Sequence, residues 1–241
     1  MQYAWFWWSL SFLLVWVIVF IFKQQFRKEM LIISLLTMPL GLTEPLFVPR
    51  YWNPPSLFNL AQKTGFDLES LIFCFSIGGI CSVFYKIIYN ARNTPLTHAE
   101  RQKHHLHRLL LTSPIIFFII LSFATSLNPI YKGIIAMFLG ALASLYCRPD
   151  LKIKIFVGGF LFTSFYFIFF FSLILFFPDY VRKTWNLKDL SGFLILGIPL
   201  EELLFAFSFG MLWSSLYEHL FWLGVGRDGR LKTPTGKNDA H

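Results

Sequence analysis

Long runs of apolar residues, separated by short polar segments, cover most of the chain. A membrane-spanning helix needs about 20 mostly apolar residues, and seven runs qualify. They cover residues 3–22, 31–48, 66–88, 109–127, 131–146, 153–177 and 190–223. The last run is too long for one straight span, and Pro199 is expected to divide it, because proline suits the first position of a helix. The pattern predicts an all-α polytopic membrane bundle of seven transmembrane helices.

A partial internal repeat relates the third and seventh runs. Aligning residues 66–85 with residues 198–217 without gaps matches 9 of 20 positions, and Glu201 then corresponds to Glu69. We interpret this match as a duplicated three-helix unit. The fourth run would add one crossing, so that both units insert in the same direction. The predicted organisation is a first three-helix repeat (1–90), a basic cytoplasmic loop and linking transmembrane helix (91–130), a second three-helix repeat (131–226) and a polar cytoplasmic tail (227–241).

Composition and charge agree with a membrane protein. Of 241 residues, 56% are hydrophobic and only 14% are charged, whereas soluble domains carry about 25% charged residues. The net charge of +8 would also suit a nucleic-acid binder, but Lys and Arg collect in the loops of one side, 15 against 6. This bias predicts an outer N-terminus and a cytoplasmic C-terminus. We expect a bacterial inner membrane and no nucleic-acid partner.

No metal ion and no cofactor are predicted. Cys74, Cys81 and Cys147 lie within or at the ends of apolar runs and are interpreted as packing thiols. The histidine-rich run at 98–108 contains metal-binding residue types, but we interpret it as a basic loop near anionic lipid headgroups. The chain also lacks a glycine-rich dinucleotide or phosphate loop.

Two adjacent carboxylates, Glu201 and Glu202, open the last predicted helix. Carboxyl groups in hydrocarbon are costly and mark functional sites. Neighbouring helical residues point about 100° apart, so one can face the interior while the other turns away. The helix N-terminus favours the charged form, whereas burial favours the neutral acid, which is the form that protonates an alkene. The alternative is that both residues cap the helix at the membrane interface.

Two further carboxylates, Glu69 and Glu44, extend this candidate site. Glu69 is either a second acid or base, or a helix cap; Asp67 and Ser70 beside it replace the proline and the second glutamate of the later motif. Glu44 precedes Pro45, which frees a backbone carbonyl one turn back. A structural role and a functional role therefore both remain open for Glu44.

Aromatic residues follow the second and sixth runs, with Tyr51 and Trp52 in one place and Tyr180 and Trp185 in the other. They form either an interfacial aromatic belt or a rim whose ring faces stabilise cationic intermediates.

These segments together resemble the integral-membrane lycopene cyclase domain family, in the fused two-repeat form of bacteria, archaea and fungi. The resemblance is carried by Gly197-Ile198-Pro199-Leu200-Glu201-Glu202-Leu203-Leu204-Phe205, by its partial copy Gly65-Phe66-Asp67-Leu68-Glu69-Ser70-Leu71-Ile72-Phe73, and by Tyr51-Trp52-Asn53-Pro54. The chain departs from the family motif at Asp67 and Ser70.

The resemblance implies a carotenoid (lycopene-like) cyclase, which converts polyene end groups to rings by a non-redox isomerisation. Glu201 and Glu202 would then act as acid and base, with a contribution from Glu69. Implied substrate contacts are Glu44, Tyr51, Trp52, Phe73, Phe205 and Phe209. The expected partners are a carotenoid or isoprenoid substrate and membrane lipid.

Two other classes of function share these features. One is a non-catalytic carotenoid or isoprenoid binder on the same scaffold, and the other is a transporter or interaction subunit of the membrane. Pigment conversion in bacteria that accumulate lycopene would separate an enzyme from a binder.

Overall fold

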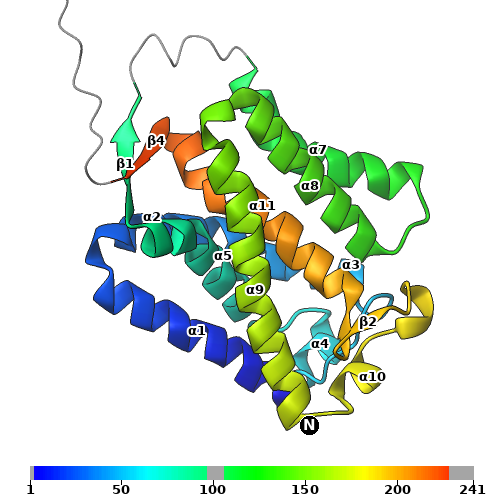
Figure 1. The fold of residues 1–241 in the computed structure, drawn as a ribbon. Coiled ribbons are helices and arrows are strands. Elements are labelled where there is room, and N and C mark those ends of the chain that lie inside the picture. Colours follow the sequence, from blue (N-terminus) through cyan, green and yellow to red (C-terminus); the bar gives the residue numbers. More distant parts are fainter. Residues whose placement is uncertain (1–2, 97–105, 228–241) are drawn as a thin grey trace, which may run out of the picture.

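The computed structural model describes residues 3–96 and 106–227 and is a bundle of long helices (Figure 1). The predicted loop at 98–108 and the tail at 227–241 fall largely outside the described residues. The principal helices are α1 (Ala4–Phe22), α2 (Arg27–Thr37), α3 (Glu44–Phe47), α5 (Leu68–Tyr89), α7 (His107–Ala124), α8 (Pro129–Cys147), α9 (Lys152–Phe176) and α11 (Leu200–Phe221).

Six helical segments are long and apolar enough to cross a membrane. They are Ala4–Phe22, Gln24–Phe47, Leu68–Tyr89, His107–Ala124, Pro129–Cys147 and Pro149–Phe176. They correspond to the first six predicted runs and confirm an all-α membrane bundle, although not a count of seven. The seventh helix, α11, has 22 residues but is not among the six. Three glutamates and a histidine lie along α11.

The second span is not one continuous α-helix. After α2, the chain passes through a 3-10 helix, η2 (Met38–Thr43), before α3 begins. Pro39 lies in this segment, and proline removes a backbone donor and crowds the preceding turn. Gly41 lies so close to α5 that an added Cβ would be 2.7 Å from the backbone nitrogen of Leu71. The irregular segment therefore brings the backbone of η2 directly against α5.

The segment before α11 is a tight turn. Strands β2 (Leu194–Ile195) and β3 (Ile198–Pro199) pair antiparallel across Leu196 and Gly197, which both have positive φ. Glycine adopts such angles readily. The helix proper begins at Leu200, directly after Pro199, so the predicted division at this proline is confirmed.

α11 lies inside the bundle, and its neighbours include α9, α8, α5 and α2. Its interior position explains how a helix with several polar residues is accommodated, because much of it faces protein. In contrast, α7 packs mainly on α8 and has Ser113 as its one buried residue. α7 therefore presents most of its surface to the exterior, as Figure 1 shows at the edge of the bundle.

Two backbone pairings connect distant parts of the chain. At one end of the bundle, β1 (Ala91–Pro95) pairs antiparallel with β4 (Leu223–Arg227). At the other end, where α4 (Leu60–Thr64) and α10 (Tyr180–Thr184) lie, Trp52 and Trp185 form an antiparallel bridge. The small strands were not predicted from the sequence.

A buried charge cluster lies towards the end that carries β1 and β4. It consists of Glu29, Lys86, Lys154 and Glu218, each no more than 3% exposed. Lys86 Nζ pairs with Glu29 and lies 2.7 Å from Glu218 Oε1, while Lys154 Nζ lies 2.5 Å from the same oxygen. Two positive and two negative side chains thus offset one another inside the bundle.

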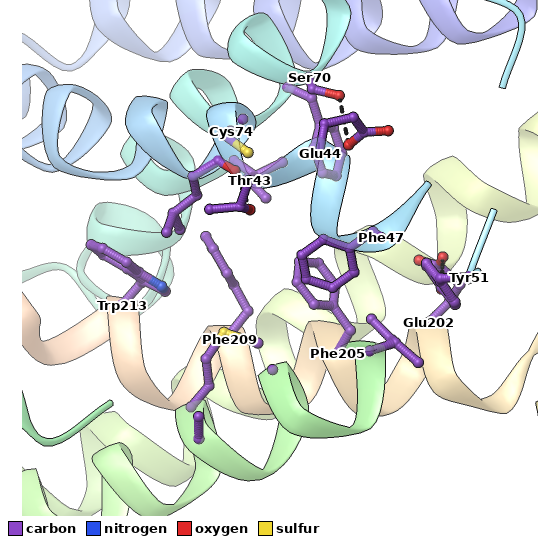
Figure 2. A pocket seen from close by; sticks show the side chains of 18 of the residues that line it. Thr43, Glu44, Phe47, Tyr51, Ser70, Cys74, Glu202, Phe205, Phe209 and Trp213 are labelled. Atoms are coloured by element: carbon purple, nitrogen blue, oxygen red, sulfur yellow. Dashed lines mark hydrogen bonds between the residues drawn. The ribbon is translucent and has the colours of Figure 1, made fainter. Parts of the chain in front are cut away.

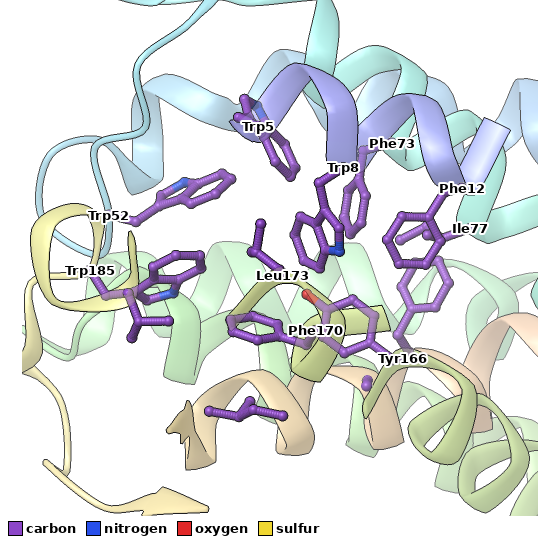
Figure 3. Packing of buried hydrophobic residues seen from close by; sticks show 14 of the residues in the cluster. Trp5, Trp8, Phe12, Trp52, Phe73, Ile77, Tyr166, Phe170, Leu173 and Trp185 are labelled. Carbon is purple, nitrogen blue, oxygen red and sulfur yellow. The ribbon is translucent and has the colours of Figure 1, made fainter. Parts of the chain in front are cut away.

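Stacked and tilted aromatic rings fill the core at the opposite end (Figure 3). Trp5 and Trp8 of α1 pack on Phe73 of α5, and Trp8 meets Phe170 of α9 with ring centroids 5.2 Å apart. Such aromatic pairs contribute about 0.5–1.5 kcal/mol each beyond the area that they bury. This aromatic packing joins α1, α5 and α9.

Candidate active site

A central cavity of about 430 Å³ lies between the helices and is mainly apolar (Figure 2). This volume is within the usual range of about 300–1,000 Å³ for small-molecule sites. The polar side chains on its wall include Glu44, Ser70, Tyr51 and Glu202. Aromatic side chains on the wall include Trp52, Phe73, Tyr166, Trp185, Phe205, Phe209 and Trp213.

One wall of the cavity reaches the outer surface of the bundle. Leu36 and Leu40, from α2 and η2, and Ile115, from α7, line it and are 45%, 39% and 65% exposed. Exposed apolar residues on a membrane bundle face lipid. This wall therefore offers an apolar molecule a lateral route from the bilayer into the cavity, between η2 and α7.

Glu202 is the most heavily hydrogen-bonded carboxylate of the cavity. Tyr51 Oη and Trp185 Nε1 both donate to Oε1, the latter at 2.8 Å, and Tyr166 Oη donates to Oε2 at 2.5 Å. The three donors come from the loop after α3, from α9 and from the loop after α10. Burial and the nearby charge of Glu202 raise the pKa of Tyr51 well above its ordinary value, so its phenol stays protonated and donates.

Glu201 points away from the cavity and holds the preceding loop. Its Oε1 accepts from Tyr131 Oη at 2.6 Å and from the backbone N–H of Ser191 at 2.8 Å. The side chain is nevertheless buried, with 1% exposure. The two adjacent glutamates therefore lie in different surroundings, as the angle between neighbouring helical residues requires.

Glu69 has a similar environment to Glu201. Its Oε1 accepts from the backbone N–H of Leu57 at 2.6 Å, in the loop that precedes α5. It is fully buried and does not line the central cavity. Asp67, the N-cap of α5, accepts from the backbone N–H of Ser70, and burial raises the pKa of Asp67.

Glu44 is the second carboxyl group on the cavity wall. Ser70 Oγ donates to its Oε2 at 3.2 Å, which is the dashed line in Figure 2. The Trp52 indole also interacts with the carboxyl group of Glu44. The Oε1 atom of Glu44 has no hydrogen bond of ordinary length within the described residues. Glu44 is 7% exposed. It accepts fewer hydrogen bonds than Glu202.

All six implied substrate contacts line the central cavity: Glu44, Tyr51, Trp52, Phe73, Phe205 and Phe209. Of the three implied catalytic residues, Glu202 lines it, whereas Glu201 and Glu69 lie outside its wall. The aromatic residues after the second and sixth runs are buried, and all of them except Tyr180 line the cavity, so they are not simply a belt at the interface.

Tyr166 is a functional candidate that the sequence analysis missed. It lies within a run of phenylalanines in α9, where a hydropathy pattern does not distinguish it. A phenol in an apolar segment is nevertheless a signal, because a buried tyrosine hydroxyl usually finds a hydrogen-bond partner. That partner here is Glu202.

Chemically, the cavity combines an aromatic lining with two carboxyl groups that have different donor sets. Such a site can give a proton to an apolar guest and remove another one, while ring faces stabilise positive charge between the two steps. The class defined by this fold and site is a membrane helical bundle with two carboxyl groups on the wall of an apolar, aromatic cavity.

Comparison with known families agrees with this class. Residues 128–220 match the family described as lycopene cyclase. This match covers α8, α9 and α11, including Glu201 and Glu202. This similarity to lycopene cyclases over residues 128–220 supports a carotenoid cyclase-type function. Together with the six apolar helices, it indicates an integral membrane protein. No curated protein and no solved structure matches the chain.

Proposed function

We propose that this protein is a membrane-embedded cyclase that converts the end group of a lycopene-like polyene to a ring. The observation that carries the proposal is the presence of Glu44 and Glu202 on the wall of one apolar, aromatic cavity. The cavity is small for a whole long polyene. We infer that it encloses one end group, while the rest of the chain extends through the gap between η2 and α7.

The reaction needs one proton in and one proton out. An acid protonates the terminal alkene, the resulting cation is attacked by a second alkene to close the ring, and a base removes a proton from a neighbouring carbon. The product is an isomer of the substrate, so no oxidant or reductant takes part. The aromatic rings beside the cavity, among them Phe205, Phe209 and Trp213, would stabilise the cation.

The donor sets favour different roles for the two carboxyl groups. Three donors to Glu202 favour its carboxylate, which suits a base. Glu44 accepts from Ser70, interacts with the Trp52 indole and has otherwise apolar surroundings, which suit a neutral acid. Glu201 and Glu69 bind backbone N–H groups of the loops before their helices, which supports a positioning role for each.

We also propose that the bundle contains two repeats of one three-helix unit, joined by α7 as the linking helix. Support comes from the element bounds: α1 and α8 both have 19 residues, and α5 and α11 both have 22. The first pair starts 125 residues apart and the second 132 residues apart. With α11 as a seventh crossing, the N-terminus would lie outside and the C-terminus in the cytoplasm.

Expression in bacteria that accumulate lycopene tests the proposed function. Pigment analysis by chromatography should show cyclic products with the unchanged chain and none with Glu202→Gln. Glu44→Gln should also abolish ring formation, whereas Glu201→Gln and Glu69→Gln should retain part of it. Protein levels in the membrane are measured for each variant.

Two outcomes would count against an enzyme. Lycopene that co-purifies with the unchanged chain but is not converted would indicate a binder instead. Full conversion by Glu202→Gln would show that the cavity carboxylate takes no part in the reaction.

A further inference from the structure

A second group of chemically reactive side chains lies outside the central cavity. We call it the His–Cys cluster, and it consists of His107, Cys147 and His219. His107 is the first residue of α7, Cys147 the last residue of α8, and His219 lies in the final turn of α11. Three helices thus each bring one metal-binding side chain to the same place.

The spacing of the three donor atoms fits a small metal ion. One ligand atom from each residue lies within 4.8 Å of the other two, and Cys147 Sγ lies 3.6 Å from His107 Nδ1. With Zn–S bonds of about 2.3 Å, Zn–N bonds of about 2.0 Å and tetrahedral angles, sulfur and nitrogen ligands are about 3.5 Å apart. The separation in the protein therefore needs little change to accept the ion.

The local structure holds these side chains in position. Cys147 and His219 are buried, and the ring of His107 stacks on Trp222 with centroids 4.0 Å apart. The rings of His107 and His219 meet edge to face at 4.6 Å. A positioned group of this kind loses little conformational freedom when it binds an ion.

Charged groups beside the cluster pair with one another. Arg148 follows Cys147 and is almost fully buried. Its own charge is balanced by Asp150, which accepts two hydrogen bonds at 2.8 and 2.6 Å. Thiolate and imidazole are ligands that zinc prefers, and three protein ligands leave one tetrahedral position for water or another group.

We propose that His107, Cys147 and His219 bind a Zn²⁺ ion that fixes α7 to the rest of the bundle. The sequence alone predicts no metal here, because the histidine-rich run is typical of a basic loop and Cys147 of a packing thiol. α7 packs mainly on α8 and contributes Pro114, Ile115 and Phe118 to the cavity wall. A metal ion at its first residue would hold this wall in register with α8 and α11.

Metal analysis of the purified full chain tests the proposal. The protein is purified in detergent with an affinity tag that contains no histidine, and zinc is measured by mass spectrometry. We expect one Zn²⁺ per chain, and loss of the ion in Cys147→Ala and in His219→Ala. Cys81→Ala is the matched control, because Cys81 is also buried but lies outside the cluster.

Replacement of zinc by Co²⁺ in the unchanged chain provides a readout that does not depend on the variants folding. A thiolate-to-cobalt charge-transfer band and intense visible bands of tetrahedral Co²⁺ are expected. Zinc well below one per chain after purification and after incubation with Zn²⁺ would overturn the proposal. Equal zinc content in Cys147→Ala and Cys81→Ala, or Co²⁺ spectra without a thiolate band, would also overturn it.

Discussion

At the residue scale, adjacent positions of one motif have different surroundings. Glu201 binds a loop N–H and a tyrosine outside the cavity wall, whereas Glu202 lines the cavity and accepts from Tyr51, Tyr166 and Trp185. The sequence indicated that the two carboxylates should diverge but could not say which faces inward. That choice depends on the rotation of α11 against its neighbours, which only tertiary packing determines.

Tyr166→Phe should lower both stability and ring formation. It removes a donor at 2.5 Å from a buried carboxylate, and hydrogen bonds to charged groups contribute about 1.5–3 kcal/mol to the free energy of unfolding. Thermal unfolding in detergent and pigment analysis measure the two effects. Tyr146→Phe is the control, because Tyr146 is 78% exposed. An unchanged melting temperature in Tyr166→Phe would contradict this account of Glu202.

The Asp67 carboxyl should make stability fall as pH rises. Burial raises its pKa in the folded protein, so the folded state binds the proton more tightly than the unfolded chain. Its contribution is complete below the ordinary pKa of aspartate and is lost as pH rises through the higher folded value. Asp67→Asn, which can still cap the helix, should therefore reduce the decrease in melting temperature from acidic to neutral pH.

The control for Asp67→Asn is Asp179→Asn, because the Asp179 side chain is 63% exposed. That variant should retain the pH dependence of the unchanged protein. If Asp67→Asn also retains it in full, the proton on Asp67 does not contribute to stability.

At the element scale, helix spans were readily predictable, and their irregular connections were not. Six of the seven apolar runs correspond to helical segments long and apolar enough to cross a membrane, since length and apolar content are local properties of the sequence. The β1–β4 pairing joins residues far apart in the sequence, such as Asn93 and Val225, which are 132 positions apart, and no local pattern marks it. The interruption of the second span at η2 could have been anticipated from Pro39, but its contact with α5 could not.

Close approach of α9 and α11 depends on glycine. A Cβ at Gly210 would lie 2.9 Å from both the Gly158 carbonyl oxygen and the Gly159 Cα. These are backbone atoms, so the helices would have to separate. We expect Gly210→Ala to lower the melting temperature, with a cost of about 1–3 kcal/mol as for other overpacked sites.

Gly133→Ala is the matched control for this helix contact. The nearest atom to a Cβ at Gly133 is Phe47 Cζ at 4.0 Å, so the methyl group fits. Alanine also favours the helix by up to ~1 kcal/mol over glycine. Equal melting temperatures for the two variants would argue against a tight α9–α11 interface.

At the scale of the whole molecule, the buried charge cluster joins helices from both halves of the chain. Lys86 of α5 contacts Glu29 of α2 and Glu218 of α11. Lys86→Met should destabilise the protein by about 3–5 kcal/mol, because removing one partner leaves uncompensated charge in the interior. Lys183→Met is the control, because the Lys183–Asp179 pair is exposed and 3.9 Å apart; a comparably small effect at Lys86 would contradict the prediction.

The arrangement of signs in this cluster has a consequence for how the halves recognise each other. Glu29 and Lys154 are each the third residue of their helix, and Lys86 and Glu218 are each the nineteenth residue of theirs. On the proposed repeat, each unit therefore carries one acid and one base in interchanged positions. Two copies of the first unit would bring lysine against lysine where Lys86 now meets Glu218, and two copies of the second would bring glutamate against glutamate. Expressed as separate chains, the halves should consequently prefer one another to themselves.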